Sequence, residues 1–122
     1  MSDHPAKDLV RRLIADVMNG GRLDALDELC TPGMAEASRR WIAPFLERYE
    51  EVHMEVVQLV AEEGAVAGRF RCSGRTADGR AFRDVDEVYF FAAEDGRLAG
   101  AWGLEDDEAR RRQLDQDPAA AA

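Results

Sequence analysis

Three acidic residues lie close together in one segment of the chain: Asp84, Asp86 and Glu87. If this segment is a β-strand, Asp84 and Asp86 share one face, roughly 7 Å apart, and Glu87 shares the other face with Tyr89. A buried carboxyl group has a raised pKa and can transfer protons to a ligand. The alternative is a solvated or dimer-facing strand whose carboxylates pair with nearby arginines.

A second pair of carboxylates, Glu105 and Asp106, follows Trp102 closely. Either carboxylate could act as an acid or a base if it faced a cavity. The alternative is that they begin a helix, because the helix dipole favours acidic residues at its N-terminus. Trp102 would then form either a pocket wall or the anchor of a dimer interface.

The other reactive residue types are isolated in the sequence. His53 is a lone histidine within the ordered part of the chain, and the sequence offers no grouping of histidines and carboxylates at metal-ligand spacing. We therefore expect no metal and no cofactor. Cys30 and Cys72 are too few for a disulfide framework, so we expect small buried hydrophobic residues in a reducing cytoplasm.

The elements that must position these residues begin with helices. Apolar residues from Leu9 to Met18 recur with helical spacing, Ser2 or Asp3 can cap this helix, and Asn19-Gly20-Gly21 ends it.

A short second helix, capped by Asp24, is expected before Pro32-Gly33. A third helix is expected over Met34–Glu51, where Pro44 marks either a kink or the true start. Three aromatic residues spaced four apart in it are expected to form core or pocket wall: Trp41, Phe45 and Tyr49.

From Val52 the apolar period changes from 3.6 to 2, which predicts strands. Four are expected: Val52–Ala61, Ala65–Gly74, Ala81–Ala93 and Arg97–Leu104. A glycine able to adopt the positive φ of a hairpin turn stands between each pair. A helix over Glu105–Leu114 and a disordered tail over Asp117–Ala122 complete the chain. Helices followed by an antiparallel meander predict an α+β fold, with one domain over residues 1–116.

Length and charge exclude several classes of protein. A chain of 122 residues suffices for one domain with one core and one pocket. Its 25 acidic and 16 basic residues give a net charge of -9, which argues against binding to nucleic acid or to an anionic membrane. It has no apolar run of about 18 residues to span a membrane and no signal-peptide core, so we expect a cytoplasmic protein.

The third expected strand is apolar on both faces near its end. Val88 and Phe90 would point one way, and Tyr89 and Phe91 the other. A sheet with one solvated face should alternate apolar and polar residues instead. Helices can cover one face, and a second copy of the chain is the simplest cover for the other, so we predict a homodimer through the sheet face.

Several ordered motifs point to one family. The segment Asn19–Leu29, followed by Pro32, matches an N-x-G-x-x-D-A-L-D-E-L opening. Two later segments, Phe82–Phe91 and Asp95–Asp106, match two closing strands. Arg112-Gln113-Leu114 matches a terminal R-Q-L. Together they cover about residues 8 to 115 and resemble the SnoaL-like polyketide-cyclase and ester-cyclase family. The resemblance implies the cone-shaped α+β fold of the nuclear-transport-factor-two superfamily, in which a curved sheet wraps three helices around a pocket and dimerises through its far side.

The resemblance also implies a chemistry. The best-known members close polyketide rings by aldol condensation, with a carboxylate as acid and base beside an apolar cavity and without metal or cofactor. At the matching positions Glu87 is implied as a pocket carboxylate and Tyr89 as a hydrogen-bond donor, while Glu105 or Asp106 could replace the cyclase acid. The expected ligand is a small apolar molecule. The expected substrate-binding residues are Trp41, Phe45, Tyr49, Phe70, Tyr89, Phe91 and Trp102.

This sequence departs from the family pattern in three places. Thr31–Met34 replaces a histidine-containing loop, and the short turn Ser73–Arg80 replaces a long Gly/Pro loop. Gly103 aligns near the cyclase acid, and glycine cannot transfer a proton. The alternative function is therefore a non-catalytic ligand-binding or dimerisation protein with a reduced pocket. For an enzyme we expect a cavity of roughly 300 Å³ or more, with Glu87 or Glu105 facing it.

Overall fold

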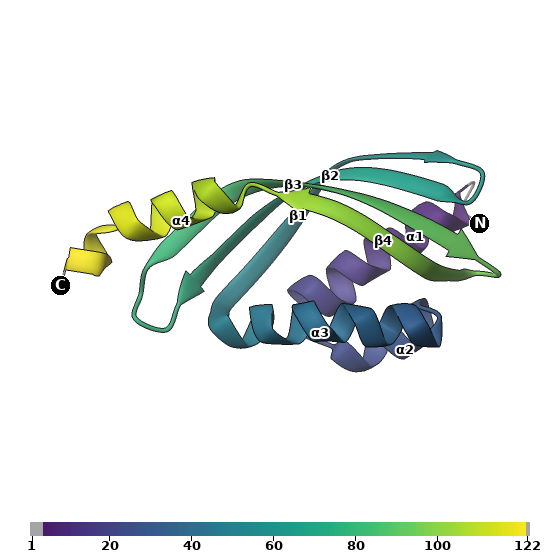
Figure 1. Ribbon diagram of the computed structural model, residues 1–122, viewed down its shortest axis with the longest axis horizontal. Helices are drawn as coiled ribbons and strands as arrows, with labels where there is room; N and C mark the ends of the chain where they lie inside the picture. The colour runs from purple at the N-terminus through teal and green to yellow at the C-terminus, as the bar shows by residue number, and fades with distance from the viewer. Residues whose placement is uncertain (1–3, 122) are drawn as a thin grey trace.

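The computed structural model describes residues 4–121, which form helices packed on one face of a curved sheet (Figure 1). The sheet is an antiparallel meander with the order β1-β2-β3-β4. Its strands are β1 (Tyr49–Glu62), β2 (Ala65–Thr76), β3 (Ala81–Glu94) and β4 (Arg97–Glu105). The helices are α1 (Pro5–Arg12), α2 (Leu26–Leu29), α3 (Pro32–Arg48) and α4 (Asp107–Gln116). The predicted α+β fold class is confirmed.

The first helix changes its winding halfway along. After α1 the chain continues as π-helical turns over Leu13–Asn19, which bury Leu13, Ile14, Val17 and Met18. Gly21 then adopts a φ of +70°, the left-handed conformation that glycine tolerates, so the helix ends where the sequence predicted. The predicted caps Ser2 and Asp3 lie outside the described residues.

The second helix is not capped by Asp24, contrary to the prediction. Asp24 lies inside a 3₁₀ turn, Leu23–Ala25, that leads directly into α2. The backbone is therefore already helical at Asp24, and its side chain makes no capping hydrogen bond.

The third helix is displaced toward the N-terminus relative to the prediction. The Thr31 side chain accepts a hydrogen bond from the Met34 amide, and Pro32 occupies the first turn, so α3 begins before Met34. It ends at Arg48 because Tyr49 is extended and pairs with Thr76 as the first residue of β1. Pro44 lies inside this helix and does not mark its start.

The four predicted strands are confirmed to within three residues at each end. Asp95 and Gly96 both have positive φ in the turn between β3 and β4, as a tight hairpin requires. Asp84 also has a positive φ, +52°, opposite a register shift between Cys72 and Gly74. This bulge breaks the alternation, so that Phe82 and Val85, three positions apart, are both buried.

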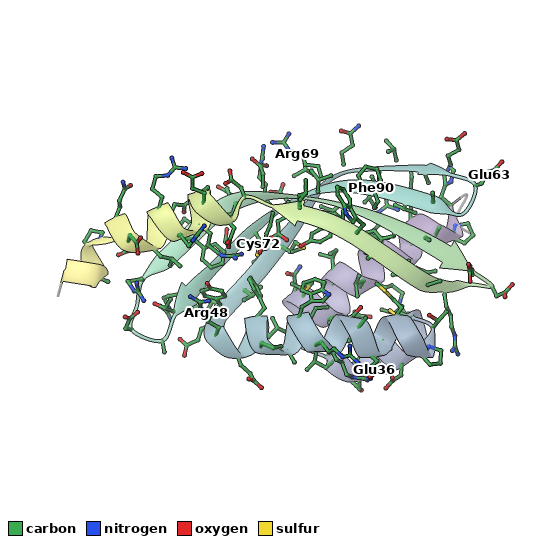
Figure 2. The ribbon with its side chains drawn as sticks, viewed as in Figure 1. Glu36, Arg48, Glu63, Arg69, Cys72 and Phe90 are labelled. Carbon is green, nitrogen blue, oxygen red and sulfur yellow. The ribbon has the colours of Figure 1, made fainter. Side chains whose placement is uncertain are left out.

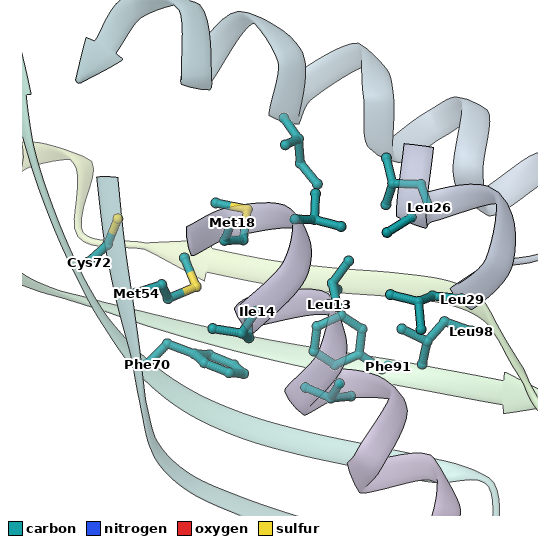
Figure 3. Packing of buried hydrophobic residues seen from close by; sticks show 14 of the residues in the cluster. Leu13, Ile14, Met18, Leu26, Leu29, Met54, Phe70, Cys72, Phe91 and Leu98 are labelled. Atoms are coloured by element: carbon teal, nitrogen blue, oxygen red, sulfur yellow. The ribbon is translucent and has the colours of Figure 1, made fainter. Parts of the chain in front are cut away.

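The core lies between the helices and the inner face of the sheet (Figure 3). Ile14 and Met18 pack toward Met54 and Phe70, while Leu29 of α2 packs near Leu98 of β4. Each large side chain that is fully buried here contributes about 1.5–3 kcal/mol of transfer free energy. This burial holds the helices against the face of the sheet on which β3 carries Glu87 and Tyr89.

The C-terminal helix α4 is attached to β3. Gln113 accepts a hydrogen bond from the Arg83 amide at 2.7 Å and donates one to the Arg83 carbonyl at 3.1 Å. Beyond it, the Asp117 carboxylate accepts hydrogen bonds from the amides of Ala81 and Ala119, and a 3₁₀ turn spans Pro118–Ala121. The Asp117 carboxylate thus joins the start of this segment to β3, and the disordered tail over residues 117–122 stays a prediction. Among the described helices, none has the length and apolar character needed to cross a bilayer.

Candidate functional site

The inner face of β3 carries a buried carboxyl group. Glu87 is 2% exposed, and its Oε1 accepts a hydrogen bond of 2.6 Å from the Tyr89 hydroxyl. Its Oε2 is buried without a hydrogen-bond partner among the described residues. Buried polar atoms in native proteins are nearly always satisfied, so this oxygen calls for a partner such as a ligand or a water molecule.

Burial raises the pKa of Glu87 above its ordinary value. The Tyr89 hydrogen bond opposes this shift, as do the Cys72 thiol and Arg110, whereas the nearby Glu105 carboxylate reinforces it. Burial likewise raises the pKa of the Cys72 thiol, which faces the carboxyl from β2. The result is a carboxylic acid that holds its proton at a higher pH than an exposed glutamate does.

The Tyr89 ring packs against two other aromatic rings and lies over a glycine. Its ring lies almost parallel to that of Trp41, with centroids 6.2 Å apart, and edge-on to Phe70 at 5.9 Å. On β4, Gly103 pairs with Tyr89, and a Cβ atom at Gly103 would overlap with the tyrosine ring. Gly103 therefore leaves the space that the Tyr89 ring occupies.

A cavity of about 270 Å³ lies between this face of the sheet and the helices. Its lining combines apolar side chains from the helices with polar ones from β3 and β4: Met18, Trp41, Phe45, Glu87, Tyr89, Gly103 and Glu105. The volume falls just below the range of about 300–1,000 Å³ typical of small-molecule sites. It has room for a ligand of one or two rings.

Glu105 of β4 lies directly beside Glu87 of β3. The two residues are direct partners in the β3–β4 ladder, and like charges in such a position destabilise a sheet. Both oxygens of Glu105 accept hydrogen bonds of 3.0 Å from the Arg110 guanidinium of α4. The repulsion is thus relieved in two ways, since Glu105 is paired with a cation and burial favours neutral Glu87.

Arg110 is itself a buried cation. It is 7% exposed, its guanidinium also contacts Asp107, and it lies 5.5 Å from the ring centroid of Phe45 and 5.8 Å from that of Tyr49. Burial disfavours its charge, but the hydrogen bonds and charge of Glu105 outweigh this and raise the pKa of Arg110. The arginine is therefore a permanent positive charge behind Glu105.

The structure separates the residues predicted for the site. Glu87, Tyr89, Trp41, Phe45 and Glu105 line the same cavity. Asp106 does not, because its side chain accepts a hydrogen bond from the Ala109 amide and caps α4.

Three of the predicted binding residues support the site from outside the cavity. Tyr49 packs edge-on against Phe45 and Phe82 in the core. Phe70 and Phe91 are buried beside Tyr89, with ring centroids 5.9 and 6.1 Å from it. They hold the tyrosine in place.

Trp102 lies on the opposite face of the sheet. It is 60% exposed, and its ring centroid is 5.7 Å from that of Phe90, which is 50% exposed. Figure 2 shows Phe90 and Arg69 on the side of the sheet away from α3. Three other large apolar residues are exposed on β1, β3 and β4: Val60, Val88 and Leu104. The pocket-wall alternative for Trp102 is therefore wrong.

Sequence reasoning missed three residues of the site. Met18 lines the cavity but has the spacing of an ordinary core residue. The sequence shows that Gly103 cannot transfer a proton, but it does not show that the missing Cβ makes room for the Tyr89 ring. Arg110 lies among three consecutive arginines of α4, and its residue type alone does not distinguish it from Arg111 or Arg112. Its position on the face that packs against Phe45 and Phe82 could have been inferred only from the helical phase.

A second hollow lies at the end of α3. It is a groove of about 480 Å³, larger and more open, whose carboxylates are Glu47, Glu50 and Glu51. Arg75 forms ion pairs with Glu50 and Glu51, and no buried carboxyl group lines the groove within the described part of the chain. Among residues 4–121, no group of three or more histidines, cysteines or carboxylates is placed to hold a metal ion. The cavity beside Glu87 is therefore the candidate site.

No protein-family model matches this sequence, and no curated protein matches it. Solved structures do match its fold. TsrD from Streptomyces laurentii is 24% identical over 93% of this chain and 97% of its own, with a TM-score of 0.82. A protein from Jannaschia sp. CCS1 described as a SnoaL-like polyketide cyclase is 19% identical over 97% of this chain and 100% of its own, with a TM-score of 0.82.

An LEH-like epoxide hydrolase from M. tuberculosis is more distant in sequence. It is 12% identical over 96% of this chain and 94% of its own, with a TM-score of 0.76. These identities establish the fold and leave the activity open. The resemblance predicted from the sequence motifs is confirmed at the level of the fold, because this chain shares the fold of these solved SnoaL-like structures.

Proposed function

We propose that this protein is a small-molecule enzyme of the polyketide-cyclase or isomerase type, which uses carboxylate acid/base chemistry on an apolar ligand. The observation that carries the proposal is Glu87, a buried carboxyl group in the wall of a mainly apolar cavity, with one oxygen bound to Tyr89 and the other unpartnered. The SnoaL-like structural neighbours support the same class of chemistry. Proton transfer of this kind requires only side chains.

The two carboxyl groups of the cavity suit opposite roles. Glu105 is an ion-paired carboxylate and can accept a proton from the carbon next to a ligand carbonyl. Glu87 holds a proton because of its burial and can donate it toward the enolate oxygen that forms. The carbon–hydrogen bond breaks, its proton passes to Glu105, and its electron pair forms the enolate. Glu87 donates a proton or a hydrogen bond to the enolate oxygen. Tyr89 fixes the position of Glu87 through Oε1.

The test is catalysed hydrogen exchange on a bicyclic ketone. 2-Tetralone in D₂O exchanges the protons next to its carbonyl, and NMR follows the loss of their signals. We expect the protein to accelerate the exchange and Glu87→Gln to remove roughly 10²- to 10⁴-fold of that acceleration. Asp86→Asn is the matched control. Asp86 directly precedes Glu87 in the sequence, but its carboxylate is exposed and forms an ion pair with Arg69. An acceleration that survives Glu87→Gln would contradict the proposal.

A second candidate function is non-catalytic binding of the same class of ligand. Gly103 favours it, because the position near the expected cyclase acid is glycine and its space is filled by Tyr89. This function predicts that 2-tetralone shifts the amide signals of residues lining the cavity without any acceleration of exchange. The exchange assay and the binding titration together distinguish the two functions.

We also propose that the protein is a homodimer through the outer face of the sheet. The support is the exposed apolar set defined above, Val60, Val88, Phe90, Trp102 and Leu104, since a contiguous apolar patch usually marks an interface. Light scattering should give twice the chain mass for the wild-type protein and the chain mass for Trp102→Glu. A wild-type monomer at micromolar concentration would contradict this proposal and leave the cavity unaffected.

A further inference from the structure

The cavity has an unusual balance of charge. Among its lining residues, Glu87 and Glu105 are acidic and none is basic. Arg110 stands directly behind Glu105, but its side chain is only 9% exposed. Any anionic group on a ligand would therefore meet Glu105 before it could meet a cation.

Both terminal nitrogens of the Arg110 guanidinium are occupied by carboxylates. Its Nη1 donates to Oε2 of Glu105, and its Nη2 donates to Oε1 of Glu105 and also contacts Asp107. Its planar surface is covered by the rings of Phe45, Tyr49 and Phe82, whose centroids lie 5.5 to 5.8 Å away. An incoming carboxylate would have to displace Glu105 to reach this cation, so it would lose water without gaining a counter-ion.

An uncharged ligand meets no such obstacle. Trp41, Phe45 and Met18 offer apolar surface to a ring, and Glu87 and Tyr89 offer polar contacts to a carbonyl or hydroxyl group. The remaining lone pairs of Glu105 can still accept hydrogen bonds from such a ligand. The site is therefore built to accept polar but neutral groups.

We infer that the Glu105–Arg110 ion pair makes the cavity select uncharged ligands, such as esters, ketones or lactones, and reject the corresponding carboxylates, with Glu105 as the specificity-determining residue. The inference rests on the proposed function, because it concerns the ligand of the same cavity. It also makes a distinct prediction: removal of the negative charge at Glu105 should expose the Arg110 guanidinium to the ligand and admit anions.

The test compares two probes that share a ring system and a carbonyl group, methyl 2-naphthoate and 2-naphthoate. Their dissociation constants are measured by calorimetry at neutral pH with the wild-type protein, Glu105→Gln and Asp86→Asn. We expect the wild-type protein to bind the ester at least about tenfold more tightly than the carboxylate. Glu105→Gln should strengthen carboxylate binding roughly 10- to 100-fold, as expected for a newly available charge-assisted pair, and so lower the preference for the ester.

Asp86→Asn removes the same charge from the outer face and should leave the ratio of the two constants unchanged. If Glu105→Gln does not fold, the wild-type protein still tests the inference. Its affinity for the naphthoate probe should then rise toward that of the ester as the pH falls and the probe becomes neutral. Equal wild-type affinities for ester and carboxylate at neutral pH, or an unchanged ratio in folded Glu105→Gln, would overturn the inference alone. If neither probe binds, the proposed function fails with it.

Discussion

The two faces of β3 carry side chains of opposite character, although those side chains alternate along one strand. Asp86 and Glu87 are neighbours in the sequence, yet Asp86 lies half-exposed and paired with Arg69 at 3.0 Å, while Glu87 is buried beside Tyr89. Phe90 and Phe91 differ in the same way, since Phe90 is half-exposed and Phe91 is buried. The chemistry of a carboxyl group in this protein is therefore decided by the layer that covers it rather than by its neighbours along the chain.

The largest expected difference between the two faces concerns stability. Phe70 is fully buried on the inner face and packs against Tyr89 and Phe91. Phe70→Ala should lower the free energy of unfolding by about 3–5 kcal/mol, through lost burial and the cavity left behind.

Phe90→Ala on the outer face is the matched control. Because Phe90 is half-exposed, the substitution should cost less than about 1 kcal/mol. Urea denaturation measures both values, at a concentration where both variants have the same mass in solution. Equal losses would contradict the assignment of the two faces.

A smaller difference is expected between two glycines of β4. Gly103→Ala places a methyl group against the Tyr89 ring, which must shift, whereas Gly100→Ala meets open space. We expect Gly103→Ala to lower the free energy of unfolding by about 1–3 kcal/mol and to displace the Tyr89 ring. Gly100→Ala should change stability by less than about 0.5 kcal/mol. A similar effect of the two substitutions would show that the Tyr89 ring does not lie over Gly103.

The third difference concerns the pH dependence of stability. The pKa of Glu87 in the folded protein lies above its ordinary value of 4.5, so its contribution to stability is fully present below about pH 4.5 and is lost as the pH rises through the folded pKa. Replacement of Glu87 by Gln should flatten the stability curve in that window, where the slope reaches at most about 1.4 kcal/mol per pH unit.

Asp86→Asn is the control for the loss of a carboxyl group from the same strand, because Asp86 lies exposed in an ion pair with Arg69. Thermal unfolding between pH 4 and pH 8 measures both variants. A curve for Glu87→Gln that parallels the wild-type curve would show that Glu87 has an ordinary pKa in the folded state.

Much of this arrangement could be predicted from the sequence. Alternation along the third strand places Glu87 with Tyr89 and opposite Phe90, and the turn glycines locate the hairpins. In the turn between β1 and β2, however, Glu63 rather than Gly64 adopts the positive φ. What could not be predicted depends on contacts between distant segments. The bulge at Asp84, the overlap between Gly103 and the Tyr89 ring, and the Arg110–Glu105 pair all arise where separate elements meet. The helix boundary at Tyr49 was mistaken because its spacing from Phe45 fits a helix, whereas pairing with Thr76 and packing against Phe82 make it a strand residue.

The pKa of the Glu87 carboxyl group in the folded protein tests the account most directly. It can be measured by NMR on protein with ¹³C-labelled glutamate carboxyls, with the signal assigned from Glu87→Gln. We predict that Glu87 titrates above 4.5 in the wild-type protein, and higher still in Tyr89→Phe, because the tyrosine hydrogen bond lowers its pKa. A carboxyl group that titrates at or below 4.5 would contradict the assignment of Glu87 as a buried acid.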